Sequence, residues 1–153
     1  MAPRTVTDSA AFAVLELSRA FRAEFDRRVA ASSLPLTPAE ARVLAHVGRY
    51  APVRPGRLAV TLGMSKMSVS EFGGSLERAG YLVRSADARD RRAKTLDLTV
   101  EGRAVLRRIG AIGRAVRRRA QGNLDEADWD RFVATAALIR ANLDGGASSR
   151  AAR

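Results

Sequence analysis

The stretch Tyr81-Leu-Val-Arg-Ser-Ala-Asp-Ala-Arg-Asp-Arg-Arg-Ala-Lys-Thr-Leu-Asp-Leu98 decides the fold of this chain. Two short β-prone runs, Tyr81 to Arg84 and Lys94 to Leu98, flank a turn that is dense in charged side chains. Such a pattern predicts a β-hairpin. The tip of this hairpin carries three guanidinium groups, those of Arg89, Arg91 and Arg92.

The segment before the hairpin has the pattern of a helix-turn-helix. Pro55 opens one helix, Gly63 supplies a left-handed turn residue, and Ser65 can cap the next helix, which runs to about Ala79. A basic hairpin appended to a helix-turn-helix is a winged helix, which most often binds duplex DNA. A solvated surface hairpin without a partner is the weaker alternative.

Four motifs follow one another in this part of the chain: Leu62-Gly-Met-Ser-Lys-Met-Ser-Val-Ser70, Leu76-Glu-Arg-Ala-Gly-Tyr-Leu-Val83, Asp87-Ala-Arg-Asp-Arg-Arg-Ala93 and Leu98-Thr-Val-Glu-Gly102. In this order they resemble the MarR family of bacterial transcriptional regulators. The Asp-x-Arg-x-x-Arg wing motif of that family is met by Asp87, Arg89 and Arg92. The resemblance implies a homodimeric repressor. It also implies a small phenolic or otherwise anionic effector that binds between the DNA-binding lobe and the helical dimer region.

The second helix of the helix-turn-helix is predicted to be the recognition helix, which enters a major groove. The predicted DNA-contacting residues are Ser65, Lys66, Ser68, Ser70, Glu71 and Ser75 of this helix, with Arg89, Arg91, Arg92 and Lys94 of the wing. Arg89 and Arg91 are the candidates for the minor groove, where a narrow groove concentrates negative potential. A carboxylate repels phosphate, so Asp87 is expected to brace the wing by pairing with Arg91 or Arg92.

The recognition helix departs from the family pattern. Glu71 and Ser75 stand where family members often carry arginine, and Gly73-Gly74 lie in mid-helix. Close backbone packing or a kink would explain the glycines. An unusual operator, in which Glu71 accepts from a cytosine N4, is the functional alternative.

Long apolar stripes lie outside the winged helix. Residues 8–31 and 99–144 are predicted to be helical, and their stripes have no local partner, so a second copy of the chain is expected to cover them. The whole of 1–153 is predicted to be one domain of the MarR type, with a DNA-binding lobe at 37–98 and disorder at 1–7 and 145–153. The predicted dimer interface comprises Val14, Leu17, Phe21, Trp129, Phe132 and Ile139.

The fold class predicted from these patterns is mainly α with a small β-hairpin wing. It is a winged helix-turn-helix with long N- and C-terminal dimerisation helices. Thr37-Pro38-Ala39-Glu40 is predicted to open the lobe's first helix as a capping box.

Composition supports a nucleic-acid partner. The formal net charge is +11, from 27 basic and 16 acidic side chains. Residues 54–98 carry nine basic and five acidic side chains, residues 99–123 seven arginines and one glutamate, and residues 124–144 two arginines and five acids. This distribution predicts a DNA-binding face on the middle of the chain. The arginines between 103 and 119 are predicted to form a solvated helix face, ahead of flanking phosphate contacts and of an anionic ligand or membrane surface.

Other classes of function find little support. The chain has no cysteine and one histidine, His46, so no metal or cofactor is predicted. No phosphate-binding glycine loop, nucleophile elbow or His-Glu-x-x-His motif occurs, so no catalysis is expected. With no apolar run near ~18 residues and no convincing signal peptide, a cytoplasmic protein without a membrane partner is predicted. The alternative to a sequence-specific regulator is an architectural DNA-binding protein with little sequence preference and no effector. A protein-only scaffold ranks third.

Overall fold

A computed structural model describes residues 10–148, with side chains through residue 144. The segments 1–7 and 149–153, which were predicted to be disordered, lie outside the described residues, as does the expected helix start at Asp8. The chain divides after Val116 into two compact units. The first unit holds α1 (Ala10–Ala30), α2 (Pro38–Tyr50), α3 (Pro55–Leu62), α4 (Lys66–Arg78), β1 (Leu82–Ala86), β2 (Lys94–Leu98) and most of α5 (Val100–Gln121); the second holds the end of α5 and α6 (Glu126–Ser148). The predicted fold class, mainly helical with one antiparallel hairpin, is confirmed.

The first helix of the lobe, α2, begins at the predicted capping box. The Thr37 hydroxyl accepts from the Glu40 amide at 3.3 Å, and the Glu40 carboxylate accepts from the Thr37 amide at 2.8 Å. Both bonds satisfy backbone groups that have no partner within the helix. The apolar face of α2 is fully buried at Val43, Leu44 and Val47, which makes this helix the centre of the lobe's core.

The α3–α4 turn has the geometry that the sequence predicts. Gly63 ends α3 with φ of 61°, which is left-handed, and the Ser65 hydroxyl accepts from the Ser68 amide at 3.0 Å to cap α4. Val69 and Leu76 of α4 are fully buried against the lobe. The helix-turn-helix is therefore fixed by local caps and by one shared core.

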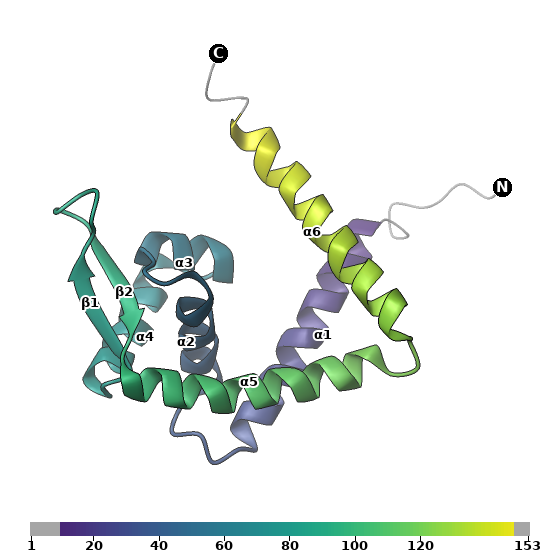
Figure 1. Cartoon of the computed structure of the whole chain (residues 1–153), viewed down its shortest axis with the longest axis horizontal. Helices are drawn as coiled ribbons and strands as arrows, with labels where there is room; N and C mark the ends of the chain where they lie inside the picture. The colour runs from purple at the N-terminus through teal and green to yellow at the C-terminus, as the bar shows by residue number, and fades with distance from the viewer. Residues whose placement is uncertain (1–9, 149–153) are drawn as a thin grey trace. The chain divides into compact units, whose positions relative to one another are not determined.

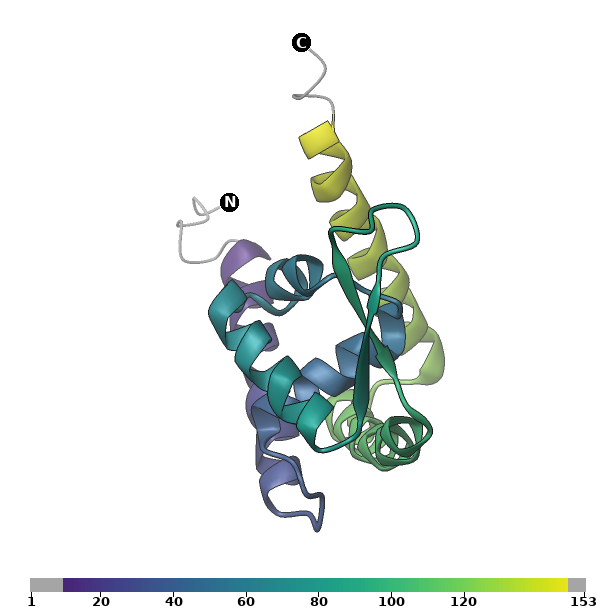
Figure 2. The same cartoon turned by 90° about the vertical axis from the view of Figure 1, so that its left-hand side faces the viewer.

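The wing is joined to the lobe by more than its own turns. β1 and β2 pair antiparallel with Leu82 opposite Leu98, and β1 lies one to two residues further along the chain than predicted. Val53, just before α3, exchanges two backbone hydrogen bonds with Leu96 of β2, at 3.0 and 2.9 Å. In both views the hairpin stands beside α3 and α4, and its tip projects beyond α3 (Figure 1 and Figure 2).

The wing leads into α5 through a tightly packed joint. The Thr99 hydroxyl accepts from the Gly102 amide at 2.9 Å and donates to the Gly80 carbonyl at 2.6 Å. Gly102 needs to lack a side chain, because a Cβ there would collide with the Tyr81 carbonyl oxygen. The predicted apolar stripe of α5 packs inward at Val105, Ile109 and Val116.

The second unit is dominated by α6, whose predicted end was wrong. Asp125 accepts from the Asp128 amide at 2.7 Å at the predicted start of the helix. At the other end, the helix continues through Gly145 and Gly146 to Ser148, past the end predicted at residue 144. Two glycines lower helix propensity by about 1 kcal/mol each without forbidding helical backbone angles.

Candidate nucleic-acid interface

The wing tip presents a group of unpaired cations. The side chains of Arg89, Arg91, Arg92 and Lys94 are all exposed. They make no hydrogen bond or ion pair with the described part of the chain, so their charges are available to an external anion.

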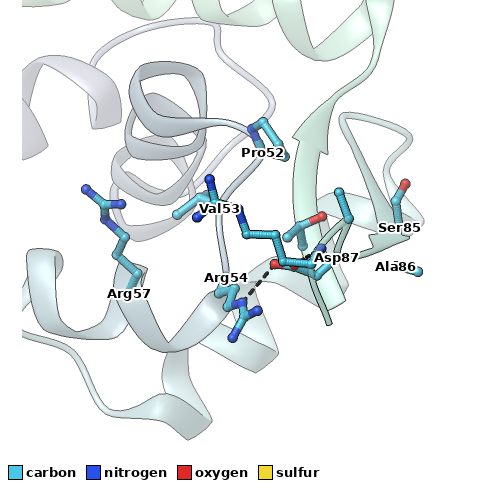
Figure 3. Close-up of a pocket in the computed structure, with 10 residues that line it drawn as sticks. Pro52, Val53, Arg54, Arg57, Ser85, Ala86 and Asp87 are labelled. Carbon is cyan, nitrogen blue, oxygen red and sulfur yellow. Dashed lines mark hydrogen bonds and ion pairs between the residues drawn. The ribbon is translucent and has the colours of Figure 1, made fainter. Parts of the chain in front are cut away.

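Asp87 organises the wing, but with a different partner from the one predicted. Its carboxylate accepts from the backbone amides of Arg89, at 2.8 Å, and Asp90, at 3.1 Å. Its ion pair is with Arg54 at 2.8 Å (Figure 3), and not with the predicted partners Arg91 and Arg92. The prediction failed because Asp87 directly follows β1, where its carboxylate faces Arg54 at the start of α3, whereas the side chains of Arg91 and Arg92 are exposed.

These bonds shift the titration of both partners. The hydrogen bond from Arg54, followed by the backbone bond from Arg89, holds the pKa of Asp87 well below its usual range. The same hydrogen bond to Asp87 raises the pKa of Arg54. Both groups are therefore charged over the whole physiological pH range.

The outer face of α4 is polar and open. Lys66, Ser70 and Glu71 are exposed, as a groove-reading face requires. Met67, which sequence reasoning did not select, is 80% exposed and could meet a thymine methyl group. Met67 could have been identified from the sequence, because it lies on α4 away from the face that carries the buried Val69 and Leu76.

Three predicted serines of α4 already have partners within the protein. Ser65 and Ser68 share a hydroxyl–hydroxyl bond of 2.9 Å in the helix cap. Ser75, which is half-buried, donates its hydroxyl proton to Glu40 at 2.6 Å. A base contact by Ser75 would require it to exchange that bond, so its observed contact holds α4 against the start of α2.

Glu40 thus serves two helices at once. Partial burial alone would raise the pKa of its carboxyl, but the hydrogen bonds from Ser75 and Thr37 outweigh it and lower the pKa. A carboxyl with a lowered pKa stabilises the fold above its unfolded-state pKa, and this stabilisation is lost as pH falls through the folded pKa.

We expect Glu40→Gln to flatten the acid side of the stability profile. The wild type should lose stability below about pH 4.5 partly because Glu40 takes up a proton there, whereas the amide cannot. Melting temperatures between pH 3 and 7 would measure the difference. Equal acid slopes in the two proteins would show that Glu40 does not couple folding to pH. Ser75→Ala is the matched variant, since it removes one hydrogen bond and leaves the carboxyl in place.

Neither mid-helix glycine of α4 is required by close packing. Gly73 is buried, and a Cβ there would lie 3.5 Å from Leu96 Cδ1, an ordinary contact distance. A Cβ at Gly74 would lie 3.4 Å from Arg78 Nη1, the mobile end of an exposed side chain. Both sites could accept alanine without moving the backbone.

The residues predicted to form a dimer interface differ in exposure. On α1, Val14 and Leu17 are 59% and 40% exposed, and Phe21 is half-buried. On α6, Phe132 and Ile139 are 41% and 49% exposed. Trp129 is buried, with its ring 5.8 Å from that of Phe132 and with the Arg117 guanidinium 5.6 Å above it.

Two arginines of α5 that were predicted to be solvated have structural roles. Arg103 donates to the Leu98 carbonyl, and Arg108 donates to the backbone and hydroxyl oxygens of Ser33, all at 3.0 Å. Arg107 and Arg114 remain exposed. His46 lies 3.0 Å from the Arg42 carbonyl through Nδ1, a local contact within α2.

No cluster of three or more His, Cys, Asp or Glu side chains that could hold a metal ion occurs among residues 10–144. Within residues 10–148, no helix combines the length and apolar composition needed to cross a lipid bilayer.

Comparisons with known proteins agree with this geometry. Residues 34–93 match the model of the MarR family. The transcriptional regulator PA3341 is 30% identical in sequence, with 90% of this chain and 99% of that chain covered and a TM-score of 0.75. A MarR-family regulator from Silicibacter pomeroyi is 23% identical over 93% of this chain and 94% of its own, with a TM-score of 0.76. The chain belongs to the MarR family of transcriptional regulators.

One further relative has been solved with its ligands. The transcriptional repressor CouR, bound to a 23-mer DNA duplex, is 26% identical over 88% of this chain and 94% of its own, with a TM-score of 0.68. CouR from Rhodococcus jostii, bound to p-coumaroyl-CoA, is 21% identical over 89% and 94% of the two chains, with a TM-score of 0.70. No curated protein sequence matches the chain.

Proposed function

We propose that this protein is a homodimeric, cytoplasmic repressor that binds an inverted repeat in double-stranded DNA and is released by a small effector. The observation that carries the DNA contact is the wing tip, where Arg89, Arg91, Arg92 and Lys94 are exposed and unpaired among the described residues. Cations so placed can neutralise phosphates and enter a narrow minor groove. The exposed face of α4 lies in the same compact unit and supplies the groove-reading element.

The dimer proposal rests on apolar exposure. Phe12, Leu15 and Leu17 of α1 and Phe132, Ile139 and Leu143 of α6 are each at least 40% exposed. Large apolar side chains exposed along a helix are typical of an interface. A two-fold dimer would present two recognition helices, which favours half-sites about one helical turn apart.

The decisive experiment is selection of binding sites from a random duplex pool. We expect an inverted repeat to emerge, with affinity at one fixed salt concentration well above that for a scrambled duplex. A pool that stays random while binding remains tight would replace this proposal with the alternative, an architectural DNA-binding protein. The alternative is supported by the short side chains on α4, since Ser70 and the two central glycines offer few base contacts.

Two interpretations of Glu71 predict different effects of its removal on DNA binding. If Glu71 accepts from cytosine N4, Glu71→Ala should relax discrimination at one base pair by ~1–3 kcal/mol. If Glu71 only lies near phosphate, removal of its charge should tighten binding to every sequence alike. We expect the second result, because α4 has few long hydrogen-bonding side chains. Affinities for the selected and scrambled duplexes measure it, and a variant unchanged on both would place Glu71 away from DNA.

The effector is proposed to be an aromatic or otherwise anionic molecule that binds between the DNA-binding lobe and the helical dimer region. The family membership supports this, as does the complex of CouR with p-coumaroyl-CoA. Benzoate, p-coumarate and p-coumaroyl-CoA are suitable probes, added to the protein–DNA complex. We expect the protein–DNA complex to dissociate, with an effect that saturates as the probe concentration rises. A complex that is insensitive to all three probes would remove these classes of effector from the proposal.

A further inference from the structure

Arg54 occupies a position where another type of residue is expected. It is the N-cap of α3, with extended backbone angles, and its side chain makes no capping hydrogen bond. Helix N-caps favour Ser, Thr, Asp and Asn, whose oxygens accept from the first amides, whereas a guanidinium can only donate. The helix therefore begins without a side-chain cap, and the arginine is engaged elsewhere.

The Arg54 side chain crosses to the wing. Its Nε donates to one oxygen of Asp87 at 2.8 Å (Figure 3). The other oxygen accepts from the amides of Arg89 and Asp90. One carboxylate thus fixes a guanidinium from α3 and the backbone that carries a wing guanidinium. Only Nε of Arg54 is used among the described residues, so its two Nη groups remain open to an acceptor, and the side chain is 48% exposed.

Arg54 and Arg89 both line a cavity of about 630 Å³ between the start of α3 and the wing. We name it the wing–α3 cleft; its lining residues are Pro52, Val53, Arg54, Arg57, Ser85, Ala86, Asp87, Ala88, Arg89 and Thr95. Three arginines against one aspartate give the lining a formal charge of +2. The negative charge of Asp87 is offset by its three donors, so the cleft favours an anion.

We propose that the wing–α3 cleft binds one backbone phosphate of the DNA through Arg54 and Arg89, with Asp87 as the positioning residue for both. The inference rests on the proposed DNA-binding function and adds a contact to it. In a helix-turn-helix complex the first helix crosses the DNA backbone, and here that helix is α3. A wing that enters the adjacent minor groove brings the same backbone past its flank. The open Nη pair of Arg54 has the planar geometry that suits two phosphate oxygens.

Arg54→Ser tests the contact without weakening the helix, because serine is a preferred N-cap. The variant dimer should bind about tenfold more weakly, to selected and scrambled duplexes alike. The slope of log affinity against log salt should fall by about two units, one for each protomer. Arg49→Ala is the matched control: it removes the same charge from the end of α2, where the Arg49 guanidinium lies over the Tyr50 ring. The control should retain most of the wild-type slope.

Asp87→Asn separates positioning from charge. If Asp87 acted through its charge alone, its neutralisation would tighten DNA binding. If it positions Arg54 and Arg89, the variant should bind more weakly with a reduced salt slope, and Arg54→Ser should add little to it. Melting temperatures of all variants serve as the folding control.

Three results would overturn the inference. One is an Arg54→Ser slope equal to that of the wild type, and another is an equal loss in Arg49→Ala, which would mean that net charge alone matters. The third comes from titration with phenyl phosphate in the absence of DNA. Saturable micromolar binding that Arg54→Ser abolishes would assign the cleft to a free organic phosphate. If the wild type binds no duplex even at low salt, the proposed function fails instead.

Discussion

Replacement of Phe132 and Ile139 together by aspartate should convert the protein from a dimer to monomers or aggregates. Both side chains lie on α6 seven residues apart, at 41% and 49% exposure, on the stripe that a second copy is proposed to cover. Buried in an interface, each carboxylate would lose its hydration without gaining a partner, at a cost of several kcal/mol per ion. Sedimentation velocity at micromolar concentration would measure the change.

The matched control is the double variant Ala134→Asp with Ala141→Asp. These alanines share the spacing of seven residues but lie on the opposite face of α6, where the exposed positions are not part of the proposed interface. The control should remain dimeric. A monodisperse monomeric wild type, or a dimer that survives the Phe132 and Ile139 changes, would contradict the assignment of α6 to the interface.

Loss of the wing arginines should have the second large effect, on affinity for DNA. Arg89→Ala and Arg91→Ala each remove an exposed guanidinium with no protein partner among the described residues. Each variant should bind its operator about 10- to 100-fold more weakly, since two charged hydrogen-bonding groups are lost per dimer. Stability should change by ~0.5 kcal/mol or less, as for most surface substitutions.

Affinity and melting temperature, measured together, check this prediction. Arg114→Ala on α5 removes the same charge from an exposed site outside the wing and serves as the control. Unchanged affinity in both wing variants would remove the wing from the DNA interface. A loss of the same size in Arg114→Ala would show that binding follows total charge only.

The helices and the wing could be predicted because their signals are local. The Thr37–Glu40 capping box, the Gly63 turn and the Ser65 cap each involve residues within a few positions of one another. Val69, Phe72 and Leu76 recur at spacings of three and four, which places them on one face of α4, and Val69 and Leu76 of that face are fully buried. Patterns of this kind reflect backbone geometry that the short segment itself imposes.

The contacts that hold these parts together could not be predicted in the same way. Arg54 and Asp87 are 33 residues apart, and Ser75 and Glu40 are 35 apart. No periodicity links such positions, so Arg91 and Arg92, which follow Asp87 in the same turn, were the expected partners for its carboxylate. The one local signal for Arg54 was negative: an arginine at an N-cap, immediately before Pro55, gives no capping bond and must have another use.

The pair of hydrogen bonds between Val53 and Leu96 has a consequence for how such a molecule could be switched off. It ties the entrance of the helix-turn-helix to a central residue of the wing strand, and Leu96 is also fully buried. The recognition helix and the wing therefore form one rigid DNA-binding unit. An effector would act more readily by changing the distance between the two DNA-binding units of a dimer than by bending either unit. The affinity of the effector-bound protein for operators whose half-site spacing differs by one base pair at a time would then report this distance.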